Sequence, residues 1–435
     1  MKEPLNIFWF RRDLRLEDNH GLFEALNGNN KVLPIFIFDS DILENLPKND
    51  ARVTFIYRSL QKLNNRLKTE HNTAISFYYG KPIDILKQLL KKHHIQVVYA
   101  NHDYEPYARK RDLEVYELTK AQEISFKTYK DQVIFEKEDI VKKDGTPYLV
   151  YTPYMKRWKE TFRKNTLKTY ASETLLNNLI AVKERTNLRL SDIGFEGSNQ
   201  HIEAYQVSPN LIKNYEVLRN FPAKDSTSKL GPYLRFGTVS VRSIVNKAIA
   251  EPNEIFWQEL IWREYFMQIL WHFPQTQTQS FKPQYDRIVW RNNETEFKAW
   301  CEGKTGYPLV DAGMRQLNKT GFMHNRVRML VGSFLCKHLL IDWRWGEAYF
   351  AEKLHDYDMA SNVGNWQWVA GCGVDAAPYF RIFNPTTQVQ KFDKNLEYIK
   401  TWIPEFQELT YSTPIVEHKF ARERCLKVYK EALNS

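Results

Sequence analysis

The first hundred residues alternate short β-rich runs with stretches that carry apolar residues at helical spacing. The β-rich runs are NIFWF, VLPIFIFD, AISFYY and IQVVYAN, and the helical patterns between them are HGLFEALN, FIYRSLQKLNNRL and PIDILKQLLKKH. This alternation predicts a parallel sheet with crossover helices, because such connections join parallel strands. No G-x-G-x-x-G follows the first strand, so the dinucleotide-binding fingerprint is absent.

The rest of the chain loses this alternation. From about residue 145 to residue 200 the sequence is polar and rich in Lys and Asn, which is typical of a long connector. After residue 201 long helical patterns take over, and most of the 12 tryptophans lie beyond residue 250. The predicted fold class is therefore an N-terminal α/β domain with a parallel, Rossmann-like sheet, followed by a large all-α domain.

The composition adds three constraints. A net charge of +10 favours a polyanionic partner, although the excess is divided between both halves of the chain and predicts a local patch only. No signal-peptide pattern and no 18-residue apolar segment are present, so a cytoplasmic protein is expected. Cys301, Cys336, Cys372 and Cys425 are widely spaced without a C-x-x-C pair, which argues against a disulfide scaffold and a zinc site.

The stretch FWQELIWREYFMQIL places Glu259, Trp262 and Arg263 on one face of a predicted helix. An acid and an arginine four residues apart are most often a solvated ion pair. The indole between them favours the alternative, a surface that stacks on a base and hydrogen-bonds to its edge.

A second helical stretch, TGFMHNRVRMLVGSFLCKHLL, places Asn325, Arg328 and Met329 on one face, with Arg326 turned about 100° away. Methionine is usually a core filler. An amide, a guanidinium and a thioether on one face would also suit the edge of a polar, planar ligand.

Two polar segments each allow two interpretations from the sequence. Ser226, Thr227, Ser228 and Lys229 precede an apolar run, and they fit either an anion site or an ordinary N-cap. Asp356 and Asp358 lack a third ligand at a useful interval, which makes hydrogen-bond acceptors for a polar ring a better interpretation than a metal pair.

The segment NVGNWQWVAGCGVDAAPYF contains two tryptophans two positions apart. In a helix, an advance of two residues turns the chain by about 200°, so Trp366 and Trp368 should point to nearly opposite sides. Different tasks are expected for the two indoles.

Taken together, these segments resemble the photolyase/cryptochrome flavoproteins, and most closely the class I cyclobutane pyrimidine dimer photolyases. The resemblance covers almost the full chain, through FWFRRDLRLEDN, STSKLGPYLRFG, ELIWREYF, TGYPLVDAGMRQL, GFMHNRVRM, WRWGEAYFAEKLHDYDMASNVGNWQWVAGCGVDAAPYFRIFNPTTQ and KFD. It implies an α/β antenna domain over residues 1–130, an interdomain linker over 131–200 and a helical FAD-binding catalytic domain over 201–435.

The resemblance also implies an activity. Reduced FAD, excited by blue or near-ultraviolet light, would pass an electron to a flipped-out pyrimidine dimer in DNA and split it without net redox change. The protein would act as a deoxyribodipyrimidine photo-lyase in DNA repair, as a monomer that needs no membrane and no metal.

The family's cofactor residues carry over position by position. Asn362 would face flavin N5, and its neutral amide can donate or accept a hydrogen bond in either flavin state. The matching FAD-binding positions are Tyr215, Thr227, Ser228, Lys229, Leu230 and Gly231 for the phosphate segment, and Arg263, Arg328, Asp356, Asp358 and Asn362 for the rest.

The substrate and electron-transfer positions carry over in the same way. The residues that match the dimer pocket are Glu259, Trp262, Asn325, Met329 and Trp368, while Arg219 and Arg326 match contacts to DNA phosphate. Trp366, Trp343 and Trp290 match a chain of three tryptophans that relays an electron to photoexcited FAD.

Several alternatives stay open. Tyr107 and Ala108 stand where folate-binding members carry an amide and an acid, so the antenna could be methenyltetrahydrofolate, a deazaflavin or none. A cryptochrome photoreceptor is disfavoured because the dimer-facing set is complete. A (6-4) photolyase is disfavoured because His324 is followed by Asn325 and not by a second histidine. A non-photochemical nucleic-acid-binding flavoprotein is disfavoured by the tryptophan triad and Asn362.

Overall fold

The computed structural model describes residues 3–181 and 188–434, so residues 182–187 of the predicted linker lie outside the described part. The chain forms two compact units. The first contains residues 1–139, 158–203 and 230–247, and the second contains residues 140–157, 204–229 and 248–435. Each unit thus draws on three segments, whereas the predicted ranges 1–130, 131–200 and 201–435 are contiguous.

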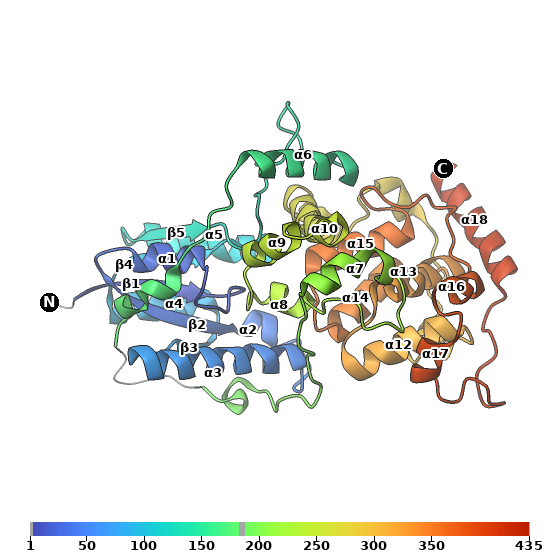
Figure 1. Ribbon diagram of the computed structural model, residues 1–435, viewed down its shortest axis with the longest axis horizontal. Coiled ribbons are helices and arrows are strands. Elements are labelled where there is room, and N and C mark those ends of the chain that lie inside the picture. The colour runs from blue at the N-terminus through green and yellow to red at the C-terminus, as the bar shows by residue number, and fades with distance from the viewer. Residues whose placement is uncertain (1–2, 182–187, 435) are drawn as a thin grey trace. The chain divides into compact units, whose positions relative to one another are not determined.

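The first unit is built on a five-stranded parallel sheet with the strand order β3-β2-β1-β4-β5 (Figure 1). Its strands are β1 (Pro4–Phe10), β2 (Lys31–Asp39), β3 (Ser76–Gly80), β4 (His94–Asn101) and β5 (Ser125–Tyr129). The first four coincide with the predicted β-rich runs. The fifth, SFKTY, was not predicted, because it is short and only half-buried.

Helices cover both faces of this sheet. Alternate residues of β1 point to opposite sides, so Phe8 and Phe10 enter one apolar cluster while Ile7 and Trp9 enter the other. The helices that surround the sheet are α1 (His20–Leu26), α2 (Ser40–Leu43), α3 (Ala51–His71), α4 (Pro82–Lys92) and α5 (Pro106–Lys120). The predicted parallel α/β arrangement is confirmed.

Three short elements and two helices complete the description up to residue 249. They are η1 (Ser172–Asn178), η2 (Leu190–Ile193), α7 (Pro209–Leu218), α8 (Gly231–Arg235) and α9 (Val241–Ile249). In addition, α6 (Tyr151–Lys164) occupies a segment that was predicted to be an irregular connector. That prediction missed Tyr151, Tyr154, Trp158 and Phe162, whose spacing of three and four residues marks an amphipathic helix.

The later part of the chain is helical, which confirms the second half of the predicted fold class. Its α-helices are α10 (Glu254–His272), α11 (Glu294–Cys301), α12 (Pro308–Thr320), α13 (Asn325–Ser333), α14 (Trp343–Lys353), α15 (Met359–Ala370), α16 (Pro385–Phe392), α17 (Glu397–Trp402) and α18 (His418–Asn434). Its other elements are the short 3₁₀ helices η3 (Pro274–Gln277) and η4 (Pro283–Arg287) and the π-helix η5 (Phe334–His338). No strand occurs among the described residues beyond 201, and none of the described helices is long and apolar enough to cross a membrane.

A buried lysine holds the C-terminal end of α15. The Lys337 ammonium donates hydrogen bonds to the Ala370 carbonyl at 2.8 Å and the Tyr379 carbonyl at 3.2 Å, and it lies over the Tyr429 ring at 3.9 Å. Burial lowers the pKa of Lys337 to about 8. A cation at this end of a helix is favourable because the terminal carbonyls carry partial negative charge. The contact anchors the helix that carries Asn362, Trp366 and Trp368.

Candidate functional site

A cavity of about 360 Å³ lies in the second unit and is lined mainly by residues of α10, α13, α14 and α15. Twelve of the residues singled out from the sequence line it: Arg219, Glu259, Trp262, Arg263, Asn325, Arg328, Met329, Asp356, Asp358, Asn362, Trp366 and Trp368. Phe266, Phe350, Leu354 and Val369 add apolar surface. One cavity therefore collects residues from segments more than 140 positions apart.

The two helical faces predicted from spacing both turn toward this cavity. Glu259, Trp262 and Arg263 reach it from α10, and Asn325 and Met329 reach it together with Arg328 from α13. Asn325 is exposed and Met329 is half-buried, so this face of α13 is not a core stripe.

Arg326, turned away on the same helix, does not line the cavity. Its guanidinium donates to the Asn220 side chain at 2.6 Å and lies over the Phe392 ring at 4.5 Å. The predicted difference in direction between Arg326 and the other face of α13 is therefore present in the structure.

Two arginine–carboxylate pairs set the charge inside the cavity. Arg328 donates from both terminal nitrogens to Asp356, at 3.2 and 2.9 Å. Arg219, which follows α7, donates to Glu259. Glu259 and Asp356, two of the carboxylates that line the cavity, are thus each held in place by an arginine.

Asn362 is oriented by a residue that the sequence analysis did not select. Its side-chain nitrogen donates to the Glu347 backbone carbonyl at 3.1 Å and to the Glu347 carboxylate at 2.9 Å. With the amide N–H groups bonded in this way, the side-chain oxygen of Asn362 is the atom left to face the cavity. Burial raises the pKa of Glu347. The signal in the sequence was one acid among aromatic and small residues in WRWGEAYF.

Asp358 has a structural task as well as a place on the cavity wall. It is the N-cap of α15, where its carboxylate accepts a hydrogen bond from the Ser361 backbone N–H at 3.2 Å. Such a cap satisfies one of the free N–H groups of the first turn.

The two tryptophans of NVGNWQW lie on α15 and both border the same cavity, so their different directions do not separate them into different pockets. Trp366 is buried and packs edge-to-face on Phe350 and Trp300, with ring centroids 5.0 and 6.2 Å apart. Its ring is so close to α14 that a Cβ on Gly346 would lie 2.1 Å from it. Trp368 is only half-buried.

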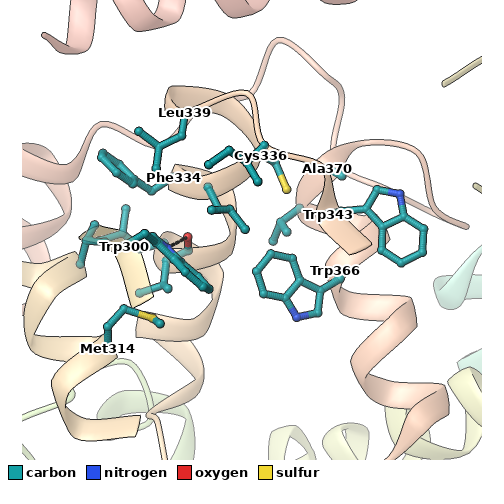
Figure 2. Close-up of a cluster of buried hydrophobic side chains, with 14 of the residues drawn as sticks. Trp300, Met314, Phe334, Cys336, Leu339, Trp343, Trp366 and Ala370 are labelled. Carbon is teal, nitrogen blue, oxygen red and sulfur yellow. Dashed lines mark hydrogen bonds between the residues drawn. The ribbon is translucent and has the colours of Figure 1, made fainter. Parts of the chain in front are cut away.

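One apolar cluster contains Trp366 and Trp343, and Trp290 packs against it; part of this cluster is drawn in Figure 2. Trp366 and Trp343 are 3% and 1% exposed, whereas Trp290 is partly exposed at the edge of the cluster. Among the three, only Trp366 borders the cavity. Burial thus decreases from the cavity-lining indole and its buried neighbour toward Trp290.

The predicted phosphate segment is not part of the cavity lining. Tyr215 is near the cavity, because the guanidinium of Arg219, which lines it, is 5.5 Å from the centre of the Tyr215 ring. Lys229 adopts a left-handed backbone conformation with φ of 52°, and its ammonium pairs with Asp225 at 2.9 Å. Leu230 and Gly231 belong to the first compact unit. Helix α8 begins there without a side-chain cap, so the alternative of an ordinary N-cap at Ser226–Lys229 does not hold.

Comparison with known proteins places this architecture in a family. Residues 6–172 match the family model described as DNA photolyase, and residues 256–410 match the FAD binding domain of DNA photolyase. The chain belongs to the DNA photolyase family. The second match spans every residue of the cavity lining except Arg219.

Individual relatives agree over nearly the full length. A protein of Agrobacterium fabrum named deoxyribodipyrimidine photo-lyase is 35% identical, with 97% of each chain covered. A bacterial class III photolyase from Agrobacterium tumefaciens has a TM-score of 0.89 at 33% identity, covering 100% of this chain and 98% of its own. An archaeal photolyase from Sulfolobus tokodaii, solved with two FAD molecules, has a TM-score of 0.82 at 32% identity, covering 98% of this chain and 100% of its own.

The residues of this photolyase-family chain fit a flavin. The Asn362 side-chain oxygen has no hydrogen-bond partner among residues 3–181 and 188–434, and it borders a cavity that also offers three guanidinium groups and the Trp366 ring. A planar ring system with polar edges needs this combination of apolar wall and fixed donors and acceptors.

At the antenna positions, Tyr107 is already engaged within the first unit. Its hydroxyl donates to the Asp39 carboxylate at 2.6 Å, at the carboxyl end of β2. Ala108 is buried in α5. The aromatic hydroxyl thus bonds to the protein's own carboxylate.

Proposed function

We propose that this chain is a light-driven DNA-repair enzyme that binds FAD and splits cyclobutane pyrimidine dimers in DNA. The observation that carries the proposal is the single cavity of about 360 Å³ in which a flavin-type set of residues and a base-binding set meet. The family membership and the relatives named deoxyribodipyrimidine photo-lyase support the same reaction. The class I assignment stays a prediction.

On the flavin side, Arg263, Arg328, Asp356, Asp358 and Asn362 would hold the cofactor. When bound and reduced, FAD supplies after light absorption the electron that cleaves the cyclobutane ring. Asn362 presents its side-chain oxygen, because Glu347 binds its amide nitrogen, and it would accept a hydrogen bond from a protonated ring nitrogen. The Arg328–Asp356 pair would fix the polar edge. Tyr215, Thr227, Ser228, Lys229, Leu230 and Gly231 remain the proposed phosphate segment.

On the dimer side, Glu259 and Asn325 would hydrogen-bond to the base edges, while Trp262, Met329 and Trp368 would form apolar walls. A dimer that leaves the DNA stack loses its base pairing, so a pocket that offers both kinds of contact compensates for that loss. In this structure Glu259 is paired with Arg219. Binding of a base edge to Glu259 therefore has to share or replace that contact.

Arg219 and Arg326 would contact DNA phosphate, which gives affinity that is independent of sequence and sensitive to salt. Trp366, Trp343 and Trp290 would carry an electron from the surface toward the cavity. Their membership of one packed cluster, with Trp290 at its partly exposed edge, supports that order.

The test is a repair assay on an oligonucleotide that contains a thymine dimer, in light and in the dark, together with the absorption spectrum of the purified protein. We expect bound FAD and repair that requires light. Illuminated enzyme that reduces its flavin but leaves dimers intact would instead identify a cryptochrome photoreceptor. The same spectrum identifies the antenna, because methenyltetrahydrofolate and a deazaflavin absorb differently from FAD.

The electron path has its own test. Trp343→Phe should abolish light-driven flavin reduction while leaving repair by chemically reduced enzyme unchanged. Trp300→Phe is the matched control, because Trp300 is also buried against Trp366 but is outside the proposed path. Equal losses in both variants would refute the path.

We further propose that the protein acts as a monomer in the cytoplasm. Size-exclusion chromatography with light scattering should give a single species near 51.8 kDa. A dimer at micromolar concentration would contradict the first part of this proposal, and fractionation of cells would test the second.

A further inference from the structure

One wall of the cavity is supported from behind by a residue outside the proposed site. Trp262 of α10 is half-buried and lines the cavity. The ring of Tyr151, at the start of α6, stacks on it with centroids 3.6 Å apart and an angle of 9° between the planes. Tyr151 does not line the cavity, so it covers Trp262 from outside the cavity.

Tyr151 is itself held from several directions. Its hydroxyl donates to the Gln258 carbonyl at 2.8 Å, and its backbone N–H donates to the Asp375 carboxylate at 3.0 Å. Its ring also meets Tyr265 edge-on, with centroids 5.8 Å apart. Only 6% of Tyr151 is exposed. The phenol ring is therefore a fixed surface on which Trp262 rests.

An indole on a cavity wall needs such support. Trp262 also stacks on Phe266, another residue of the cavity lining, with centroids 5.4 Å apart and 29° between the planes, so Tyr151 is the closer and more nearly parallel of the two stacked rings. A flat aromatic partner favours one orientation through close packing and ring electrostatics. Preorganised walls reduce the ordering cost that is paid when a ligand binds.

We propose that Tyr151 is a positioning residue that fixes the orientation of the Trp262 ring, which forms one wall of the dimer pocket. The inference rests on the proposed function, because it takes Trp262 to contact the extruded dimer. Through the hydrogen bond to Asp375, it also connects the loop that follows α15 to the orientation of this wall. Tyr151 contacts neither the substrate nor the reacting atoms.

The test measures the dissociation constant for a dimer-containing oligonucleotide with Tyr151→Leu and Tyr151→Phe. An aromatic pair of this kind is worth enough that Tyr151→Leu should weaken binding by roughly 2- to 12-fold. Tyr151→Phe keeps the ring and should bind like the wild type. FAD content and light-driven flavin reduction should not change in either variant.

Tyr154→Leu is the matched control on α6. Tyr154 is also buried and meets the ring of Tyr265, with centroids 5.1 Å apart. This variant should bind the dimer normally even if α6 is less stable. In a Trp262→Ala background, Tyr151→Leu should cause no further loss of affinity, because two residues that act through one contact are not additive.

Unchanged affinity in Tyr151→Leu, an equal loss in Tyr154→Leu, or additive losses in the double variant would each overturn the inference while the proposed function stands. A wild-type protein that neither prefers dimer-containing DNA nor repairs it in light would overturn the proposed function, and this inference with it.

Discussion

His324 should make the second unit lose stability as the pH falls, and the effect can be isolated. His324 precedes α13 as its N-cap, and its Nδ1 accepts a hydrogen bond from the Arg326 backbone N–H at 3.2 Å. The side chain is 3% exposed. Burial, with added repulsion from Arg328, Arg326 and Arg219, lowers the pKa of His324 from 6.5 to about 4. A protonated imidazole cannot accept the capping hydrogen bond.

The sign and size of the effect follow from this shift. Because the folded-state pKa is below the unfolded value, the unfolded chain binds more protons between pH 6.5 and pH 4, and the free energy of unfolding falls as the pH is lowered through that range. Relative to pH 7, the contribution of His324 decreases by about 1 kcal/mol at pH 6, about 2 kcal/mol at pH 5 and about 3 kcal/mol at pH 4.

The assay compares the wild type with His324→Asn in urea unfolding followed by tryptophan fluorescence. Asparagine is a good N-cap that does not titrate, so the variant keeps the cap and removes the proton linkage. The stability difference between the two proteins should change by about 3 kcal/mol from pH 7 to pH 4, in favour of the variant. A difference that stays constant over this range would refute the assigned pKa and its cause.

Three further outcomes are expected. Gly346→Ala should destabilise the protein by about 1 to 3 kcal/mol in urea unfolding, because the added Cβ would lie 2.1 Å from the Trp366 ring; a neutral result would show that the ring moves freely. Glu347→Ala should slow light-driven flavin reduction, measured by absorbance, because the Asn362 amide loses its carboxylate partner; an unchanged rate would contradict this role. Arg326→Ala should lower the slope of log affinity against log salt concentration by about 1, and an unchanged slope would remove Arg326 from the phosphate contacts.

Local sequence signals were sufficient for the regular elements and for the direction of side chains within one helix. The first four strands follow from β-rich runs between helical patterns, and the signal is strongest for β1 and β2, which are buried almost throughout. The shared faces on α10 and α13 follow from 3.6 residues per turn alone. The short strand β5 and the helix α6 were missed because neither has a strong apolar run, although aromatic residues at helical spacing mark α6.

Other features depend on contacts between distant segments. No spacing rule links Glu347 to Asn362, Arg219 to Glu259 or Tyr151 to Trp262, because each contact joins different elements of the chain. These contacts exist only after the helices have packed, and packing is decided by how whole side-chain surfaces fit together.

The segment NVGNWQW illustrates both the local signals and the contacts between distant segments. By itself the sequence determined that Trp366 and Trp368 diverge, since two residues of α-helix turn the chain by about 200°. The tertiary structure decided that both indoles nevertheless border one cavity, because α10, α13 and α14 pack around α15 and enclose both sides of the helix. Helix geometry is local, whereas the position of a cavity depends on several helices together.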